Sequence, residues 1–141
     1  MELPTYEQAQ YNTYINTVNF DLEDFYTNVR YNRNNLLNYI TVSDFTAFPH
    51  NSDKVLVYDY GKLLNINLKK YPTLFKYVLN AMVEDIPESW NEMIDTYGRI
   101  YYQHKYLSET IRCHPMNVYY SNLIREKKKR IQKRKNSCSI M

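Results

Sequence analysis

A continuous apolar stripe between Pro72 and Ile86 is the clearest periodic pattern in the chain. Its residues recur at alternating intervals of one and three positions: Leu74, Phe75, Val78, Leu79, Met82, Val83 and Ile86. This spacing places them on one side of an α-helix. Pro72 suits the first helical position, where its missing N–H costs nothing, and Pro87 ends the pattern. The sequence therefore predicts an amphipathic helix over residues 72–86.

Two further helices are predicted in the N-terminal third. Residues 3–18 are weakly periodic, with Pro4 near their start. Asn19 is the N-cap expected for the second helix, because acidic residues follow in its first turn, where the helix dipole favours negative charge. The Asn-rich residues 32–35 predict a break, and residues 41–53 predict a loop. The apolar face of the second helix comprises Phe25, Val29, Leu36, Leu37 and Ile40.

Two short apolar runs predict strands, and a fourth helix is predicted between them, after the one over residues 72–86. Val55–Tyr58 is too short for a helix and rich in β-branched residues. Val118–Tyr120 lies in residues 112–123, which we expect to be extended because Pro115 opposes a helix. The helix is predicted from Pro87 to Ile111 on spacings of 3, 4 and 7 among Trp90, Met93, Ile94, Tyr97, Tyr101, His104 and Ile111.

Together these elements predict a mainly α fold, a small helical bundle with one or two short β-strands and a disordered basic C-terminal tail. A chain of 141 residues, 44% of them hydrophobic, is large enough for one small domain with its own core. We expect Phe75, Met82, Trp90 and Ile94 to meet in the interior between two successive amphipathic helices. The N-terminus has no secretory signal pattern, and no apolar run approaches the length of a membrane span.

Charge divides the chain into two parts of opposite sign. Residues 1–124 contain ten Lys and Arg against fourteen Asp and Glu, a net charge of −4. Residues 125–141 contain eight Lys and Arg and one Glu, a net charge of +7. We therefore predict a helical domain over residues 1–124 and a basic tail over residues 125–141. The tail has too few apolar residues to fold alone, so it is either a solvated helical extension or disordered.

The basic tail carries the candidate binding residues. They are Lys127, Lys128, Lys129, Arg130, Lys133, Arg134 and Lys135. A cluster this dense binds nucleic-acid phosphates by releasing counterions, serves as a nuclear import signal, or binds anionic lipid. A solvated run of charge without a dedicated partner is the fourth interpretation, and the sequence alone leaves all four open.

Motifs of catalysis, phosphate binding and metal binding are missing from the sequence. It has no glycine-rich phosphate-binding loop, nucleophile elbow or zinc-protease motif. His104, Cys113 and His114 lack the pair spacing of metal ligands, and a structural zinc site requires four ligands. Glu84 and Asp85 are expected at a solvated helix end. We therefore predict a protein that is not an enzyme, with no catalytic residue, cofactor, metal or small-molecule substrate.

The last four residues, Cys138 to Met141, fit the C-a-a-X pattern in which the cysteine is prenylated. A final Met is typical of farnesylation. One prenyl chain binds membranes weakly, so the adjoining basic cluster is the expected second signal. On this hypothesis Cys138 is the prenylation site of a small helical adaptor, which binds the anionic, cytoplasmic face of a membrane. The alternative is a coincidence at an arbitrary chain end.

Three segments, in this order, resemble parts of the MCM family, the ring-forming replicative helicase subunits. Val55–Leu64 (VLVYDYGKLL) is similar to a short strand that runs into a D-x-x-x-L turn. Tyr71–Ile86 (YPTLFKYVLNAMVEDI) is similar to a helix of the family, with Pro72 and Ala81 at matching positions. Ile111–Glu126 (IRCHPMNVYYSNLIRE) resembles the strand that enters the family's OB-fold.

The resemblance covers approximately residues 10–126 and implies the N-terminal helical domain of an MCM subunit. It implies a nuclear protein that packs against MCM-type subunits of a hexamer, close to DNA, in replication or repair. The interval between strand and helix looks shorter than in most members. The chain also ends where the OB-fold, zinc motif and ATPase module would follow, so the family's DNA-binding and catalytic residues have no matching positions and none is assigned.

Overall fold

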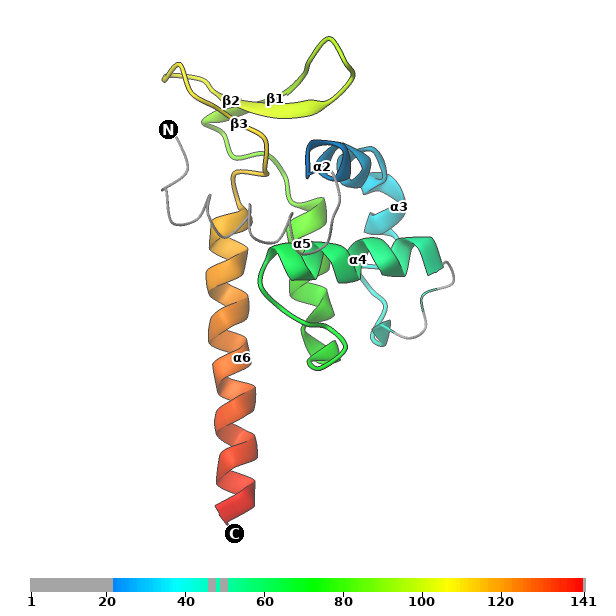
Figure 1. Cartoon of the computed structure of the whole chain (residues 1–141), viewed down its shortest axis with the longest axis vertical. Coiled ribbons are helices and arrows are strands. Elements are labelled where there is room, and N and C mark those ends of the chain that lie inside the picture. Colours follow the sequence, from blue (N-terminus) through cyan, green and yellow to red (C-terminus); the bar gives the residue numbers. More distant parts are fainter. Residues whose placement is uncertain (1–21, 46–47, 49–50, 141) are drawn as a thin grey trace.

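The computed structural model describes residues 22–45, 48 and 51–140, with side chains up to Lys135. Its elements are α2 (Leu22–Tyr31), α3 (Arg33–Leu37), α4 (Asn51–Leu63), the 3-10 turn η2 (Pro72–Leu74), α5 (Phe75–Val83), β1 (Trp90–Ile94), β2 (Ile100–His104), β3 (Thr110–Ile111) and α6 (Asn117–Ile140). The predicted mainly α class is confirmed, together with one antiparallel sheet of order β1-β2-β3. The sheet lies at one end of the molecule, and α6 extends beyond the other helices at the opposite end (Figure 1). The predicted helix over residues 3–18 and its neighbour Asn19 fall outside the described residues.

The amphipathic helix predicted at residues 72–86 is confirmed over most of its length and forms the centre of the fold. Pro72 begins η2, as expected for a first-turn proline, and α5 follows directly. The helix ends at Val83 because Glu84 adopts an extended backbone with ψ of 141°. α5 packs against α2, α3, α4 and α6. Its buried side chains are Phe75, Val78, Leu79, Ala81, Met82 and Val83.

The strand predicted at Val55–Tyr58 is wrong, because these residues belong to α4. Burial along α4 follows a helical period: Asp53, Val57 and Tyr60 are buried, whereas Val55 is 53% exposed. Four apolar residues are too few to separate the period of a strand from that of a helix. The buried residues on either side of the run, Asp53 and Tyr60, belong to the same face of the helix as Val57.

The helix predicted from Pro87 to Ile111 is also wrong, because this segment forms the antiparallel sheet. A tight turn joins β1 to β2. In this turn, Oδ1 of Asp95 accepts the backbone N–H groups of Tyr97 (2.8 Å) and Arg99 (3.0 Å). Gly98 has a φ of 78°, a left-handed conformation that glycine adopts without strain. The Asp and Gly positions are therefore turn signals within what looks like a helical pattern.

Two of the four predicted core residues lie outside the core as a result. Phe75 and Met82 are buried, as predicted. Trp90 is half-buried on β1, and Ile94 at the other end of the same strand is 61% exposed. Residues four positions apart share a face in both a helix and a strand, so their spacing does not distinguish the two structures.

Contacts with α2 fix the position of the sheet. The guanidinium group of Arg99 forms ion pairs with Glu23 (2.9 Å) and Asp24 (2.8 Å). The backbone N–H of Ile100 donates to Oγ1 of Thr27 at 2.9 Å, at a buried position. These contacts join residues more than seventy positions apart, which explains why the local pattern of the segment does not reveal the sheet.

Within the extended segment predicted at residues 112–123, the part from Asn117 onward is instead the beginning of α6, and it includes the predicted strand Val118–Tyr120. Pro115 lies in the turn that leads into the helix, where a proline loses no hydrogen bond. Nδ1 of His114 accepts the backbone N–H of Met116 (3.0 Å), the residue directly before α6. The proline therefore precedes a helix that begins two residues later, whereas the prediction took it as a barrier to one.

The predicted break in the second helix is confirmed, because α2 ends at Tyr31 and α3 begins at Arg33. Leu37 and Ile40, predicted on the apolar face, are exposed. Residues 51–53 of the predicted loop belong to α4. Leu36, the first predicted residue of the face after the break, is buried, so the apolar face continues across the Asn-rich stretch only in part.

Candidate polyanion-binding surface

α6 carries the predicted cationic residues, within a stretch that we define as the basic segment, Arg125–Lys135. The segment lies within the helix α6. α6 packs against α5 and η2, with Ile124 buried and Ile131 half-buried on the packed side. By the helical period, four exposed cations share the other side: Lys129, Arg130, Lys133 and Arg134.

The inner side of the basic segment lies against Tyr71, directly before η2. The Nζ atoms of Lys128 and Lys135 lie 5.4 and 5.7 Å from the centroid of the Tyr71 ring. Lys70 approaches the same ring at 5.6 Å, and the amide of Gln132 donates to the Tyr71 hydroxyl oxygen at 3.0 Å. These cation–π contacts and the hydrogen bond hold the segment against the body of the protein.

The cations of the basic segment have little internal compensation. Within the part of the chain that the structure describes, ion pairs of this segment are limited to Nζ of Lys129 with Oε1 of Glu126, at 3.7 Å. Lys127 instead lies 5.6 Å from the ring centroid of Tyr77. Acidic residues of α2 and the sheet pair with arginines at the other end of the molecule. The positive charge of α6 therefore faces solvent.

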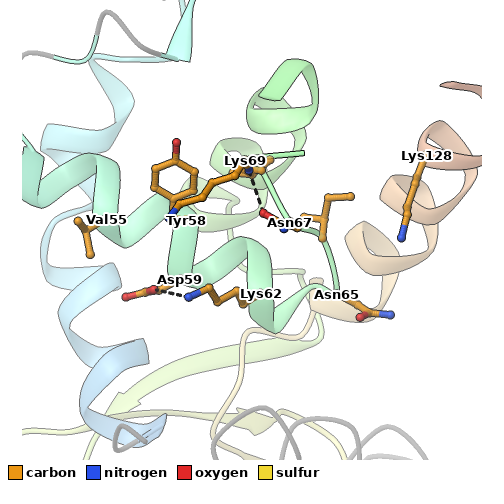
Figure 2. Close-up of a pocket in the computed structure, with 10 residues that line it drawn as sticks. Val55, Tyr58, Asp59, Lys62, Asn65, Asn67, Lys69 and Lys128 are labelled. Atoms are coloured by element: carbon orange, nitrogen blue, oxygen red, sulfur yellow. Dashed lines mark hydrogen bonds and ion pairs between the residues drawn. The ribbon is translucent and has the colours of Figure 1, made fainter. Parts of the chain in front are cut away.

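A pocket of about 610 Å³ opens beside the basic segment, between α4 and the chain that follows it (Figure 2). One wall is a tight turn at the end of α4. Asn65 has a φ of 66°, its N–H donates to Lys62 O (3.0 Å), and Ile66 N–H donates to Gly61 O (2.8 Å). This is the Schellman pattern of a helix C-terminus. A Cβ at Gly61 would lie 3.3 Å from Ile66 O, so the glycine permits the close approach.

Three lysines from three elements line this pocket: Lys62 of α4, Lys69 of the following loop and Lys128 of α6. Figure 2 shows Lys128 on one side of the pocket and Lys62 and Lys69 on the other. Among the described residues of the lining, the one carboxylate is that of Asp59, which lies 3.8 Å from Nζ of Lys62. Because Lys128 belongs to both features, the pocket and the basic segment form one continuous surface, which we call the basic surface.

The residues considered as metal ligands have structural roles. His104 packs against Trp90 with ring centroids 5.0 Å apart, and Cys113 and His114 are buried. Nε2 of His114 donates to the carbonyl oxygen of Glu84 at 3.1 Å, because Nδ1 is already an acceptor. Burial and the nearby Arg30 lower the pKa of His114 to about 3. Among the described residues, no three His, Cys, Asp or Glu side chains are grouped to hold a metal ion.

The acidic pair Glu84–Asp85, predicted to be solvated, connects elements of the fold. Oε2 of Glu84 accepts the hydroxyl proton of Tyr120 at 2.5 Å, which ties the end of α5 to α6. Asp85 is exposed and pairs with Arg33 of α3 at 2.6 Å. Burial and the Glu84 contact raise the pKa of Tyr120. Glu84 thus joins α5 to α6, whereas Asp85 is solvated, as predicted, and pairs with Arg33 at the surface.

The C-a-a-X hypothesis for Cys138 stays a prediction. Cys138 is within α6, but its side chain is outside the described part of the chain. None of the helices in the described residues is long and apolar enough to cross a bilayer.

No model of a known protein family matches the chain, and no curated protein matches it. The MCM resemblance therefore stays a prediction. Of its three segments, Tyr71–Ile86 has the expected helix over most of its length. The strands expected within Val55–Leu64 and Ile111–Glu126 are replaced by α4 and, from Asn117 onward, by α6. The resemblance thus keeps one of the three secondary structures on which it depends.

Proposed function

We propose that this chain is a non-catalytic module that associates with DNA through the basic segment of α6. The observation that carries the proposal is the set of exposed cations on one face of that helix, Lys129, Arg130, Lys133 and Arg134. DNA phosphates are a closely spaced line of negative charge, and each Lys or Arg that contacts one releases a condensed counterion. A helix that extends beyond the body presents such cations without steric obstruction from the other helices (Figure 1).

The resemblance of Tyr71–Ile86 to an MCM helix supports a setting for this association. In that setting the chain is an MCM-like N-terminal module in the nucleus. It packs against other subunits of a hexameric replication or repair helicase and places α6 near DNA. DNA association is proposed from the charge of α6, and the helicase setting is proposed from the resemblance.

The test is the salt dependence of DNA binding, measured with a charge-matched pair of variants. We expect Lys133→Gln/Arg134→Gln to reduce the slope of log Kobs against log salt by about 2, because each phosphate contact contributes about 0.9. Lys54→Gln/Lys105→Gln removes the same charge outside the basic surface, and we expect it to leave the slope unchanged. Fluorescence anisotropy of a labelled DNA at several salt concentrations gives both slopes.

Two results would contradict the proposal. One is a wild-type affinity for DNA that does not change with salt. The other is an equal change of slope in the two variants, which would assign the effect to net charge and not to α6.

Membrane association is the second candidate, favoured by the sequence Cys138-Ser139-Ile140-Met141 directly after the basic segment. It requires Met141 to be the last residue of the protein in the cell. On this candidate, Cys138→Ser shifts the protein from the membrane fraction to the soluble fraction, because the basic segment alone binds anionic lipid reversibly. A protein that remains nuclear and soluble, with or without this substitution, contradicts the candidate.

A further inference from the structure

We infer that the pocket between α4 and α6 binds the phosphorylated terminal nucleotide of a nucleic-acid strand. The inference rests on the proposed function, because the strand is the one that the basic segment of α6 holds. The pocket volume of about 610 Å³ lies within the range of sites that enclose small ligands. Lys128 connects the pocket to the basic segment, so one strand can contact both.

Two of the pocket lysines are held by aromatic rings. Nζ of Lys69 lies 5.9 Å from the centroid of the Tyr58 ring, and Nζ of Lys128 lies 5.4 Å from that of Tyr71. A ring attracts an ammonium group through its quadrupole and leaves N–H groups able to donate elsewhere. These two lysines are therefore positioned at the pocket and still able to bind an anion.

The charge of the lining suits a phosphomonoester. Lys62, Lys69 and Lys128 provide three positive charges, and Asp59 provides one negative charge, which leaves a net charge of +2. A phosphomonoester carries about −1.5 to −2 at pH 7. An internal phosphodiester carries a single negative charge and is flanked by nucleotides on both sides. A terminal phosphate therefore matches the charge of the pocket better and reaches into it more readily.

The apolar part of the lining suits the nucleoside that carries this phosphate. Val55 and the half-buried Tyr58 line the same pocket as the lysines, and Val55 is 53% exposed although it is β-branched and apolar. The other apolar residues of the lining, Ile66 and Leu68, are buried. The side chain of Asn67 accepts the backbone N–H of Lys69 at 3.0 Å, which orders the loop between them. The pocket thus combines an apolar surface for a base or sugar with cations for a phosphate, on a turn fixed by hydrogen bonds.

The experiment compares three single-stranded oligonucleotides of one sequence, each with an internal fluorophore. One has a 5′-phosphate, one has a 3′-phosphate, and one has hydroxyl groups at both ends. At pH 7.5 we expect a phosphorylated end to increase the affinity on the order of tenfold, because it adds a charge beside three ammonium groups. In Lys62→Gln/Lys69→Gln we expect all three oligonucleotides to bind with the same affinity.

The matched control is Lys133→Gln/Arg134→Gln, which removes the same charge outside the pocket. We expect it to weaken the binding of all three oligonucleotides and to preserve the preference for the phosphorylated end. Lys62 and the control residues are exposed, so circular dichroism should show folded proteins in both variants.

The outcomes separate this inference from the proposed function. Equal affinity of the wild type for the three oligonucleotides overturns the inference and leaves DNA association intact, whereas no binding to any of them overturns both. Binding of AMP that is lost in Lys62→Gln/Lys69→Gln supports the inference when an end preference is also seen. The same binding without an end preference overturns the inference in favour of free nucleotides. If the protein binds phosphatidylserine vesicles but none of the oligonucleotides, and Lys62→Gln/Lys69→Gln abolishes this binding, the inference is overturned in favour of a membrane.

Discussion

Replacing Asn117 with Ala is expected to lower the free energy of unfolding by about 2–5 kcal/mol, because it removes a buried polar contact and leaves a cavity. Asn117 is 0% exposed at the start of α6. Its Oδ1 accepts the hydroxyl proton of Tyr60 in α4, and its Nδ2 donates to the hydroxyl oxygen of Tyr26 in α2 at 3.1 Å. The amide therefore joins three helices. Urea unfolding followed by circular dichroism measures the loss.

A mutant cycle separates the hydrogen bond from the cavity. In a Tyr60→Phe background the substitution Asn117→Ala is expected to be less costly, because that background has no Tyr60 hydroxyl to lose its acceptor. The cavity contribution is the same in both backgrounds. If Asn117→Ala were equally destabilising in both, the bond to Tyr60 would contribute nothing to stability.

Stability is expected to decrease as the pH falls from about 6.5 toward 3, because of His114. Burial and Arg30 lower the pKa of His114 to about 3 in the folded protein, below its ordinary value of 6.5. Between these values the unfolded chain binds a proton that the folded protein does not, so acid favours unfolding. One such group contributes roughly 3 kcal/mol between pH 6.5 and pH 4. Chemical denaturation at several pH values measures this slope.

The groups around His114 explain why it stays neutral. Arg30 and Arg33 approach from α2 and α3, and both oppose a second positive charge. The ring of Tyr102 lies 5.4 Å away between centroids. Protonation would place a hydrogen on Nδ1 and abolish its bond from the N–H of Met116. The neutral form is thus required by the hydrogen bond in the turn that precedes α6.

The control for this prediction is His114→Asn. The Asn side chain can still accept a backbone N–H at the start of a helix, but it does not titrate. We expect a lower stability at pH 7 and a smaller loss between pH 6.5 and pH 4 than in the wild type. An unchanged slope would show that other groups cause the acid sensitivity.

The candidate surface is predictable from the sequence only in part. Lys129, Arg130, Lys133 and Arg134 are recognisable because local charge density needs no knowledge of the fold. The role of Tyr71, which holds the segment against the body, is not predictable in this way. A tyrosine before a proline does not by itself indicate a contact with a distant lysine. Lys62 and Lys69 do not belong to a dense basic run of the sequence, and they join Lys128 only because the turn at Asn65 directs the loop back beside α6.

The sequence by itself determined the central helix, the break between α2 and α3 and the separation of charge. Each of these depends on residues that are neighbours along the chain, such as Pro72 with the stripe that follows it. Only the tertiary structure decided that residues 51–63 are helix and residues 90–111 are sheet. Short apolar runs fit both periods, and the contacts that select one, such as Arg99 with Glu23, join distant residues.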